Sequence, residues 1–475
     1  LLLEHLRAVA KSRGITHFEA DVLGSNHPMM GVFDGAGYPI AHNLEAGVWE
    51  VDLDVTEEAT AEIEAREQVG EAASVAKILR PVGVAVVGAS KKDGSIGNAL
   101  LKNILESGFQ GVVHPVNPTA KSVLGVKAYP SVLDIPDDID LAIISVPHTI
   151  APKVLEECGQ KGIAGAVIIT AGFAEIGEEG AKAQAEMMAS ARHHGVRIIG
   201  PNCMGIVNSE PNVRLNATFA PVRPHQGRVG FVSQSGALGI AILSAANAQG
   251  VGISSFLSVG NKADISGNDI IQYWETDPET DIGLLYLESF GNPRKFGRIA
   301  RRFTRKKPLI VVKSGRTEAG ARGASSHTAA MASSDVLTQT LFEQAGIIRV
   351  DTLEELFNVA RVLTHQPLPK GNRVAIVGNS GGPGILAADA CEGAGLSVPE
   401  LSDQTKAKLR EVLPLGAAVG NPVDLVADSG PEEYEAALRI ILDDDDIDSV
   451  IIIYTDPLVS DPTEVGQAVR RAVSE

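Results

Sequence analysis

The sequence predicts an α/β fold made of successive strand, turn and helix units with parallel sheets. Short aliphatic runs at residues 84–87, 229–233 and 374–377 are each followed by a Gly-rich turn and then by apolar residues at helical spacing. Further aliphatic runs alternate with helical patterns along most of the chain. This repetition indicates parallel strands with helices on both faces of each sheet.

Length and composition indicate a globular protein of several domains. The 475 residues exceed what one ordinary core accommodates, and we expect about three domains. Hydrophobic residues make up 44% of the chain and aromatic residues only 4%, so the cores are aliphatic. The formal net charge of -18 repels nucleic acid and anionic lipid, and we expect neither nucleic acid nor a membrane as a partner.

The cysteines favour a cytoplasmic location. Cys158, Cys203 and Cys391 lie far apart and show neither a CxxC pair nor a disulfide framework. No apolar run approaches the roughly 18 residues of a membrane span, and no secretory leader opens the chain. The chain begins Leu1-Leu2-Leu3, without methionine, and we expect it to be a fragment of a longer polypeptide.

The N-terminal part is predicted to contain two short helices and two short strands. Apolar spacing indicates helices at 1–12 and 28–37 and a strand at 16–22, with a further strand before residue 45. Such a segment is too short to fold alone. The acidic stretch 57–67 has helical spacing with little to bury, so it predicts a solvated linker helix.

Three α/β units follow, separated by turn-rich segments at 221–227 and 364–372. The first unit is expected to close at 200–202, and the third to be cut short at its end. The expected strands are 84–87, 111–116, 141–146, 166–170 and 196–199 in the first unit; 229–233, 253–259, 282–288 and 309–313 in the second; and 374–377 and 449–454 in the third.

The first Gly-rich turn, 88–97, predicts a nucleotide site. Glycines allow the backbone to approach a phosphate, and the N-terminus of the following helix supplies N–H donors. A nicotinamide site would usually have an acidic residue at the end of the next strand, whereas this strand leads to Asn117 and Lys121. These residues favour a phosphate-rich nucleotide such as coenzyme A over NAD. A turn without any ligand remains the alternative.

The second motif, 231–239, predicts a phosphate site at another strand-to-helix turn. Ser233, Ser235 and Gly236 can offer hydroxyl and backbone N–H donors at a helix start. The order of residues differs from the GxSxG elbow of hydrolases.

The third motif contains the best candidate for a catalytic histidine. His327 lies among glycine, alanine and serine in a long loop after the strand at 309–313. An imidazole nitrogen can accept a phosphoryl group, and a carboxylate can fix the other ring nitrogen. Glu288, at a strand end, is the candidate for that role, with a surface glutamate as the alternative. We expect no metal site, because His193-His194 and the acidic run 443–446 fit solvent-exposed positions better.

Taken together, the motifs resemble the NDP-forming acyl-CoA synthetases, which include ADP-forming acetate–CoA ligase and succinyl-CoA synthetase. The resemblance runs in order from about Val82 to Val423 and beyond. A separate segment, 14–40, resembles the closing quarter of a GNAT acetyltransferase. The synthetase motifs are VVGAS, GSIGN, HPVNP with a following lysine, ITAGF, GPNCMGIVN, FVSQSGALG, SVGNKADISGNDII, LYLES and GRTEAGARGASSHTAA.

The resemblance implies the domain order and fold. A Rossmann-like domain is expected to precede two flavodoxin-like domains, with a partial GNAT α+β segment in front. The implied boundaries are 1–45 for the GNAT segment, 46–75 for a linker helix, 76–222 for the CoA-binding domain, 223–366 for the succinyl-CoA synthetase-like domain with the phosphohistidine, and 367–475 for the flavodoxin-like ligase domain, which we expect to be truncated.

The resemblance also implies a reaction and its residues. A small carboxylic acid, CoA and ATP would give acyl-CoA, ADP and phosphate reversibly, through an acyl phosphate and a phosphohistidine. His327 corresponds to the phosphorylated histidine and Glu288 to its partner, while Ser233, Ser235 and Gly236 correspond to the phosphate-holding helix start. The implied CoA contacts are Gly88, Ser90, Gly97, Asn98, Asn117, Lys121, Ile169, Thr170 and Ala171.

Partners and alternatives remain open at this point. No ATP-grasp motif occurs in these residues, so ATP, ADP and Mg²⁺ are expected to act through an ATP-grasp domain or subunit elsewhere. A homo-oligomer is also expected. The alternative function is a regulatory module that binds CoA or acyl-CoA for a protein lysine acetyltransferase; a nicotinamide dehydrogenase is a weaker third hypothesis. The acyl group, the nucleotide and the working direction do not follow from the sequence.

Overall fold

The structure is a computed structural model that divides the chain into two compact units, residues 1–365 and 366–475. No helix in the part of the chain that the structure describes is long and apolar enough to cross a membrane. The described residues are 6, 9–10, 13–34, 40–55, 61–289 (backbone only for 61–64), 291–317, 320, 335–456 and 461–474.

A small antiparallel sheet forms the start of the first unit. Its strand order is β1-β3-β2, and helix α2 packs on it through Met30 and Phe33, beside Val51 and Leu53. The predicted strand at 16–22 and helix at 28–37 are confirmed as β1 and α2, whereas most of the predicted helix at 1–12 lies outside the described residues. The bounds are β1 His17–Leu23, α2 His27–Asp34, β2 Ile40–Glu45 and β3 Val48–Asp54.

The predicted linker at 46–75 is wrong in two respects. Strand β3 lies within these residues. It pairs with β1 on one side and with β2 on the other, so this stretch belongs to the sheet. Helix α3, Ala61–Leu79, runs past residue 75 and is not solvated along its length: Val75, Ile78 and Leu79 are buried. These apolar residues at the end of the helix outweigh the acidic residues at its start.

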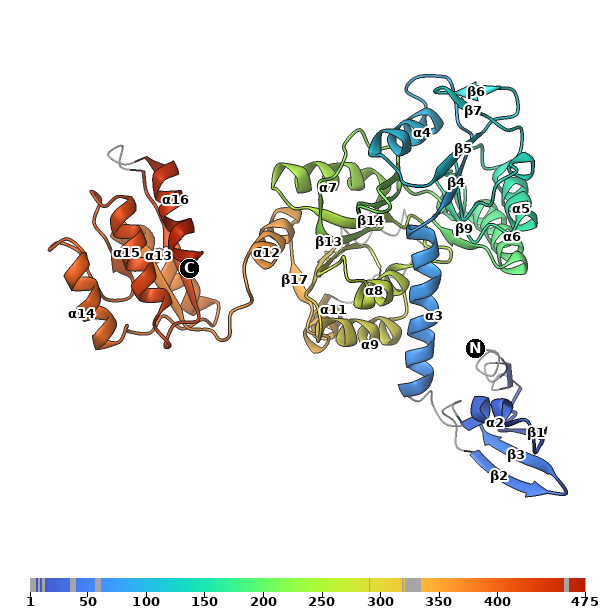
Figure 1. The fold of residues 1–475 in the computed structure, drawn as a ribbon, viewed down its shortest axis with the longest axis horizontal. Coiled ribbons are helices and arrows are strands. Elements are labelled where there is room, and N and C mark those ends of the chain that lie inside the picture. The colour runs from blue at the N-terminus through green and yellow to red at the C-terminus, as the bar shows by residue number, and fades with distance from the viewer. Residues whose placement is uncertain are drawn as a thin grey trace. The chain divides into compact units, whose positions relative to one another are not determined.

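The first lobe, residues 83–199, contains a parallel sheet with strand order β10-β9-β8-β4-β5. Alternate residues of each strand enter two different cores, one with α4 and α3 and the other with α5 and α6, so helices cover both faces (Figure 1). The five strands predicted between residues 84 and 199 are confirmed in this lobe. The bounds are β4 Gly83–Val87, α4 Ile96–Ser107, β5 Val112–Val116, β8 Leu141–Ile144, α5 Ala151–Lys161, β9 Gly165–Ile168, α6 Glu178–His194 and β10 Arg197–Ile199, with a small hairpin of β6 Ser122–Val123 and β7 Val126–Lys127.

The second lobe, residues 205–365, contains a mixed sheet with strand order β12-β11-β14-β13-β15-β16-β17. The four predicted strands form its parallel centre. Strands β11 and β12 were not predicted, and β11 pairs antiparallel with both β12 and β14. This sheet therefore begins before the expected domain boundary at 222/223, since residues from 205 onward already belong to it. The bounds are β11 Gly205–Asn208, β12 Leu215–Thr218, β13 Gln226–Ser233, β14 Ile253–Ser258, β15 Ile282–Leu287, β16 Leu309–Lys313 and β17 Ile348–Val350.

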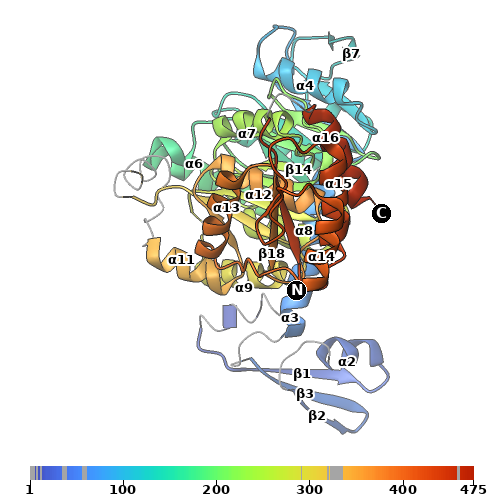
Figure 2. The same ribbon diagram turned by 90° about the vertical axis from the view of Figure 1, so that its left-hand side faces the viewer.

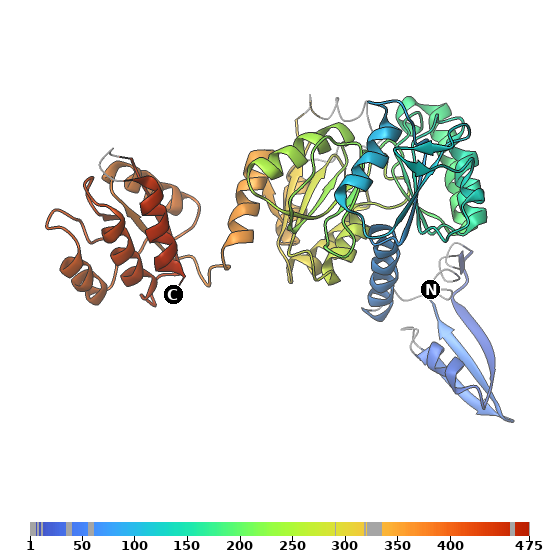
Figure 3. The same cartoon turned by 45° about the horizontal axis from the view of Figure 1, so that its top comes forward.

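Helices cover both faces of the second sheet and join the lobes. Helices α7 and α12 pack on one face, and α8, α9 and α11 on the other, where the core is continuous with that of the first lobe. Helix α4 of the first lobe also lies against the second lobe (Figure 3), where it packs on edge strand β12. The Asn103 amide of this helix donates to the carbonyls of Thr218 and Ala220. The bounds are α7 Gly236–Ala248, α8 Gly267–Thr276, α9 Pro293–Thr304, α11 Asp335–Gln344 and α12 Leu353–His365.

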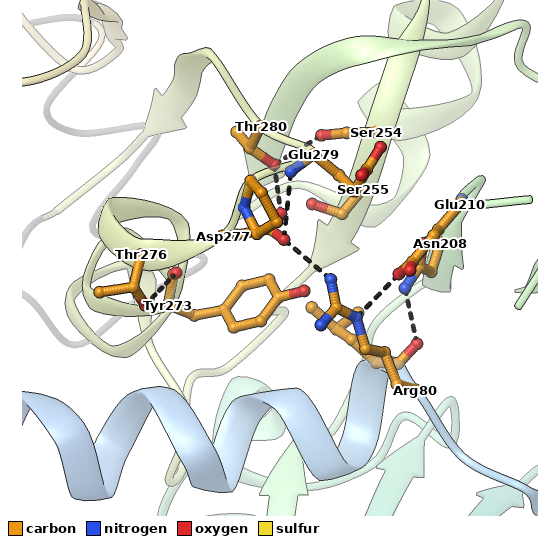
Figure 4. A network of polar contacts seen from close by, with 12 residues as sticks. Arg80, Asn208, Glu210, Ser254, Ser255, Tyr273, Thr276, Asp277, Glu279 and Thr280 are labelled. Atoms are coloured by element: carbon orange, nitrogen blue, oxygen red, sulfur yellow. Dashed lines mark hydrogen bonds and ion pairs between the residues drawn. The ribbon is translucent and has the colours of Figure 1, made fainter. Parts of the chain in front are cut away.

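Arg80 fixes the end of α3 to the second lobe (Figure 4). Its guanidinium pairs with Glu210 at 2.8 Å and Asp277 at 2.9 Å and lies 6.0 Å from the ring centre of Tyr273. Burial alone would lower the pKa of Arg80, but the surrounding acidic groups raise it above its ordinary value, so the guanidinium stays charged. The relative placement of the two lobes is thus held by charged and apolar contacts.

The second unit is a smaller α/β domain whose sheet has the order β19-β18-β20. Figure 2 shows α13 on one side of β18 and α15 and α16 on the other, as their separate cores require. The predicted strands 374–377 and 449–454 are confirmed. The bounds are β18 Val374–Gly378, α13 Gly381–Gly393, α14 Asp403–Val412, β19 Val423–Asp424, α15 Pro431–Leu442, β20 Ser449–Ile453 and α16 Pro462–Val473.

Candidate functional site

A cavity of about 710 Å³ lies between the two lobes of the first unit. It forms where parallel strands of both sheets end, which is the usual position of a ligand site in such folds. The lining residues are Ile96, Ser145, Val146, Ile169, Thr170, Ala171, Glu175, Asn202, Cys203, Phe219, Gln234, Ser235, Gly236, Ala237, Ile240, Gly260, Asn261 and Glu288.

The cavity brings together predicted residues that are far apart in the sequence. Ile169, Thr170 and Ala171 line it from the end of β9, Ser235 and Gly236 from the start of α7, and Glu288 from the end of β15. The Thr170 hydroxyl donates to the carbonyl of Val146 at 2.7 Å and so fixes the strand end. Candidate CoA contacts and candidate phosphate contacts therefore share one space.

The Gly-rich turn before α4 requires glycine at two positions. A Cβ on Gly97 would lie 2.0 Å from the carbonyl oxygen of Gly88. Gly88 itself has φ +89°, and a Cβ there would lie 2.2 Å from the carbonyl oxygen of Ser145. The start of α4 thus sits directly against the turn, and Ile96, its first residue, lines the cavity. Only residues without a side chain allow this approach.

The other predicted CoA residues of this lobe lie outside the cavity lining. The amide of Asn98 donates to the carbonyl of Ser90 at 2.9 Å, and that of Asn117 to the carbonyl of Ala89 at 2.8 Å. Both side chains therefore brace the turn, which is a role the sequence did not predict. Lys121 is exposed.

Helix α7 begins at the cavity with a hydroxyl cap. Ser235 is its N-cap, and the hydroxyl oxygen accepts from the backbone N–H of Leu238 at 3.3 Å. The first turn contains no acidic residue, so the partial positive charge of the helix start is not already neutralised there. Ser233 lies outside the lining: it is fully buried, and its hydroxyl donates to the carbonyl of Ser235 at 2.7 Å.

Gln234 fixes the position of Glu288. Its side-chain oxygen accepts from the backbone N–H of Glu288 at 2.5 Å and from that of Ser289 at 2.9 Å. Its side-chain nitrogen donates to the carbonyl of Ser289 at 2.5 Å. Gln234 is only 7% exposed, so this amide contact is shielded from water. The sequence analysis missed this role, although Gln234 lies inside one of the quoted motifs.

Two lysines lie at the same strand end, Lys313 buried and Lys262 partly buried. Lys262 donates from Nζ to the carbonyl oxygen of Ser289 at 3.0 Å and to its hydroxyl at 2.6 Å. Burial lowers the pKa of Lys262 to about 8; the negative charge of Glu288 opposes this change, and the positive charge of Lys313 adds to it. Burial also lowers the pKa of Lys313. Sequence analysis missed both lysines, because nothing local indicates that they converge on Glu288.

Glu175 is a second carboxylate at the cavity that was not predicted. It accepts from the backbone N–H of Gly172 at 2.5 Å and from the side-chain amide of Asn261 at 2.6 Å. Burial alone would raise the pKa of Glu175, but these hydrogen bonds outweigh it and hold the pKa below its ordinary value. Since Glu175 belongs to the first lobe and Asn261 to the second, this pair ties the lobes together beside the cavity.

His327 lies outside the described residues, so its position relative to Glu288 stays a prediction. The strand before its loop is nevertheless informative. β16 runs parallel to β15, and Lys313 is paired with Leu287 at the end of both strands. The loop that contains His327 therefore starts next to Glu288. Among the described residues, no three His, Cys, Asp or Glu side chains are grouped so that they could hold a metal ion.

Three protein-family profiles match consecutive parts of the chain. They are a CoA binding domain at residues 83–209, a succinyl-CoA ligase like flavodoxin domain at 226–363 and a ligase-CoA domain at 374–475. These three matches correspond in order to the first lobe, the second lobe and the second compact unit.

Curated relatives and a solved structure match over most of the chain. Acetate–CoA ligase (ADP-forming) II subunit alpha of Pyrococcus furiosus is 44% identical over 398 residues, covering 83% of this chain and 86% of the relative. Acetate–CoA ligase (ADP-forming) I of Archaeoglobus fulgidus is 42% identical over 83% of this chain, but the chain spans only 56% of that relative. A Candidatus Korarchaeum cryptofilum dinucleotide-forming acetyl-coenzyme A synthetase 1, solved with phosphate and ADP, matches with a TM-score of 0.81 and 37% identity, covering 84% of this chain and 86% of that one.

Proposed function

Because this chain belongs to the family of ADP-forming acetate–CoA ligases, as its identity to their alpha subunits shows, we propose that it is the core of an NDP-forming acyl-CoA synthetase. It would convert a small carboxylic acid, CoA and ATP reversibly to acyl-CoA, ADP and phosphate. The observation that carries this proposal is the single cavity at which the end of β9, the start of α7 and Glu288 converge.

The two lobes would hold different parts of the reactants. The turn at 88–97 fits a nucleotide phosphate, since an added Cβ at Gly97 would fill the space against Gly88. Ile169, Thr170 and Ala171 would then contact CoA at the cavity. The start of α7 offers unpaired backbone N–H groups and the Ser235 hydroxyl to a phosphate ion.

Since the reaction is reversible, its two transfers can be followed from acyl-CoA toward the free acid, and synthesis of acyl-CoA would run through them in reverse. A phosphate oxygen attacks the thioester carbonyl, the C–S bond breaks, and CoA leaves as the thiolate, which gives the acyl phosphate. A ring nitrogen of His327 then attacks phosphorus, the bond to the acyl oxygen breaks, and the carboxylate leaves. Glu288 would accept a hydrogen bond from the other ring N–H and stabilise the charged imidazole. Gln234 and Lys262 would hold Glu288 in place.

Completion of the cycle requires a site for ATP or ADP in addition to the cavity described above. We propose an ATP-grasp domain or subunit as the partner, which would supply Mg²⁺-bound ATP or ADP to phospho-His327. Two Pyrococcus furiosus relatives named as alpha subunits support a separate partner. A homo-oligomer and a cytoplasmic location stay predictions.

A second candidate function rests on the N-terminal segment. Its order of strand, helix and two paired strands, β1, α2, β2 and β3, supports our hypothesis that it closes a GNAT acetyltransferase domain. In that case the synthetase-like part could instead bind CoA or acyl-CoA as a regulatory module. A His327→Ala variant would then acetylate normally, while a variant of the 88–97 turn would lose its response to ligand.

Phosphate labelling tests the main proposal. The full-length protein with its ATP-grasp partner, Mg²⁺ and ATP labelled in the γ-phosphate should acquire acid-labile label. His327→Ala should abolish the label, whereas His17→Ala, an exposed histidine of β1, should leave it unchanged. Labelling of the His327→Ala protein at the wild-type level would refute the assignment.

A further inference from the structure

A second cavity of about 330 Å³ lies at the opposite end of α4 from the site described above. Its walls come from the last residue of α4, from β11 and β12 with the residues next to them, and from the segment that leads into β13. The lining residues are Ser107, Val207, Asn208, Ser209, Arg214, Leu215, Asn216, Arg223, Pro224, His225 and Gln226.

The charged residues of this cavity are two arginines. Arg214, Arg223 and His225 line it, and no acidic side chain does. No carboxylate among the described residues lies within ion-pair distance of either arginine. In a chain with a net charge of -18, two guanidinium groups without acidic partners mark a local positive potential.

Another cavity of the second lobe provides the contrast. It is also lined by two arginines, Arg316 and Arg349, but three carboxylates line it as well. Arg316 pairs with Asp351 and Arg349 with Asp335, so those charges are already satisfied within the protein. The cavity beside α4 lacks this internal compensation.

The wall of the cavity contains a side-chain amide that can donate a hydrogen bond. Asn216 of β12 is only 4% exposed, and its side-chain oxygen accepts from the hydroxyl of Thr218 at 2.8 Å. Its side-chain nitrogen has no acceptor among the described residues, although it lines the cavity. This nitrogen is not one of the fully buried side-chain atoms that lack a partner, so it is open to water or to a ligand that supplies an acceptor.

The segment that contains Arg223 and His225 is held in place. The side-chain nitrogen of Asn247 donates to the carbonyl of Arg223 at 2.6 Å, and its oxygen accepts from the backbone N–H of His225 at 2.9 Å. The Arg223 guanidinium also donates to the carbonyl of Glu106 near the end of α4. This contact uses one of the five N–H groups of an arginine, so further donors remain for a ligand.

We propose that this cavity binds a phosphate group. A carboxylate is satisfied by one arginine through two parallel hydrogen bonds, whereas a phosphate has three acceptor oxygens and can accept from several donors at once. Arg214, Arg223, His225 and the Asn216 amide supply such a set from two separate chain segments. The phosphate group is either inorganic phosphate or the phosphate of a nucleotide. This site is distinct from the start of α7 and does not depend on the proposed reaction.

Calorimetric titration of the full chain with inorganic phosphate, and separately with AMP, tests the site. Arg214→Gln/Arg223→Gln should weaken one class of binding by about ten- to a hundredfold, because two charge-assisted contacts are lost. Ser235→Ala, at the start of α7, should retain that class. A loss for inorganic phosphate identifies the free ion as the ligand, and a loss for AMP alone identifies a nucleotide phosphate.

Binding of both probes that is unchanged in the double variant, or absent from the wild-type protein, would overturn the proposal. Arg223 contacts the end of α4, so the fold of the double variant is checked by its melting temperature. Arg214→Glu provides an independent variant, since Arg214 is exposed and its side chain has no hydrogen bond among the described residues. It reverses one charge and should weaken binding at least as much as Arg214→Gln.

Discussion

Lys262 donates hydrogen bonds to the carbonyl oxygen of Ser289 at 3.0 Å and to its hydroxyl at 2.6 Å. Ser289 follows Glu288, so a partly buried cation holds the backbone next to the carboxylate that we expect to orient His327. The same cation lies in the field of Glu288, which raises the otherwise depressed pKa of Lys262. Position and charge at this strand end are therefore coupled.

Replacement of Lys262 should impair phosphoryl transfer more than it impairs folding. Lys262→Met removes both hydrogen bonds and the positive charge, and we expect the rate of histidine labelling to fall by about tenfold or more, since hydrogen bonds to charged groups contribute about 1.5–3 kcal/mol. Lys262→Arg keeps the charge and should recover part of the rate. Labelling rates for the three proteins provide the measurement; equal rates for the Met variant and the wild type would contradict this role.

The depressed pKa of Lys262 predicts a pH dependence of stability. The pKa is about 8 in the folded protein and 10.5 ordinarily, so between these values the unfolded chain holds a proton that the folded protein has released. The free energy of unfolding of the wild type should therefore rise with pH across this window, relative to Lys262→Met. Below pH 8 both states are protonated and the difference should be constant. Denaturant titrations on either side of pH 8 measure it, and parallel pH profiles of the two proteins would exclude the depressed pKa.

Gln234 should matter for the position of Glu288 rather than for its charge. Gln234→Ala leaves the backbone N–H groups of Glu288 and Ser289 without their partner, at a cost of about 1–3 kcal/mol for each group that stays buried, whereas the Ser289 carbonyl keeps its contact with Lys262. We expect lower stability in denaturant and slower histidine labelling. Gln110→Ala, which removes an exposed contact to Gly108, is the control and should change neither. Histidine labelling of the Gln234→Ala protein at the wild-type rate would show that the hydrogen bonds of Gln234 are not needed to position Glu288.

Much of the fold follows from local patterns. The aliphatic runs of the parallel strands and the Gly-rich turns after them are visible in the sequence, and each leads to a strand end at a known edge of a sheet. Glu288 could be predicted for the same reason, since it directly follows such a run. The position of His327 was predicted from composition and resemblance, and it falls outside the described residues.

The remainder depends on contacts that no local pattern reports. Strands β11 and β12 are short and partly polar, and only the pairing of β11 with β14 and of β12 with β11 shows that they belong to the second sheet. Gln234 and Lys262 precede Ser289 by 55 and 27 residues in the sequence, yet both donate to its carbonyl. Asn98 and Asn117 carry the right chemistry for a ligand, but the nearest acceptors are carbonyls of the turn itself.

The close approach of α4 to its turn predicts a large effect of a single methyl group. Gly97→Ala places a Cβ 2.0 Å from the carbonyl oxygen of Gly88, and neither backbone can yield without moving the turn. We expect CoA affinity to fall by about tenfold or more and stability to fall by about 1–3 kcal/mol, as in other overpacked sites. Calorimetry with CoA measures the first and denaturant unfolding the second.

Gly70→Ala is the matched control for that substitution. Gly70 also lies in a helix, α3, but an added Cβ there meets nothing within 4 Å. Alanine in a helix interior is favoured over glycine by about 0.5–1 kcal/mol, so this variant should be slightly more stable and should bind CoA normally. Normal CoA binding by Gly97→Ala would show that the turn at 88–97 does not form the CoA site.

Two N-cap substitutions distinguish an effect on phosphate binding from an effect on helix stability. Ser235→Ala and Ser402→Ala each remove an N-cap hydroxyl, from α7 at the cavity and from α14 in the second unit. Each should cost about 0.5–2 kcal/mol of stability. Only Ser235→Ala should also weaken phosphate binding at the cavity, because only that hydroxyl lies beside the unpaired N–H groups of the α7 start. Phosphate titrations of both variants make the comparison, and equal losses, or none, would indicate that phosphate does not bind at this helix start.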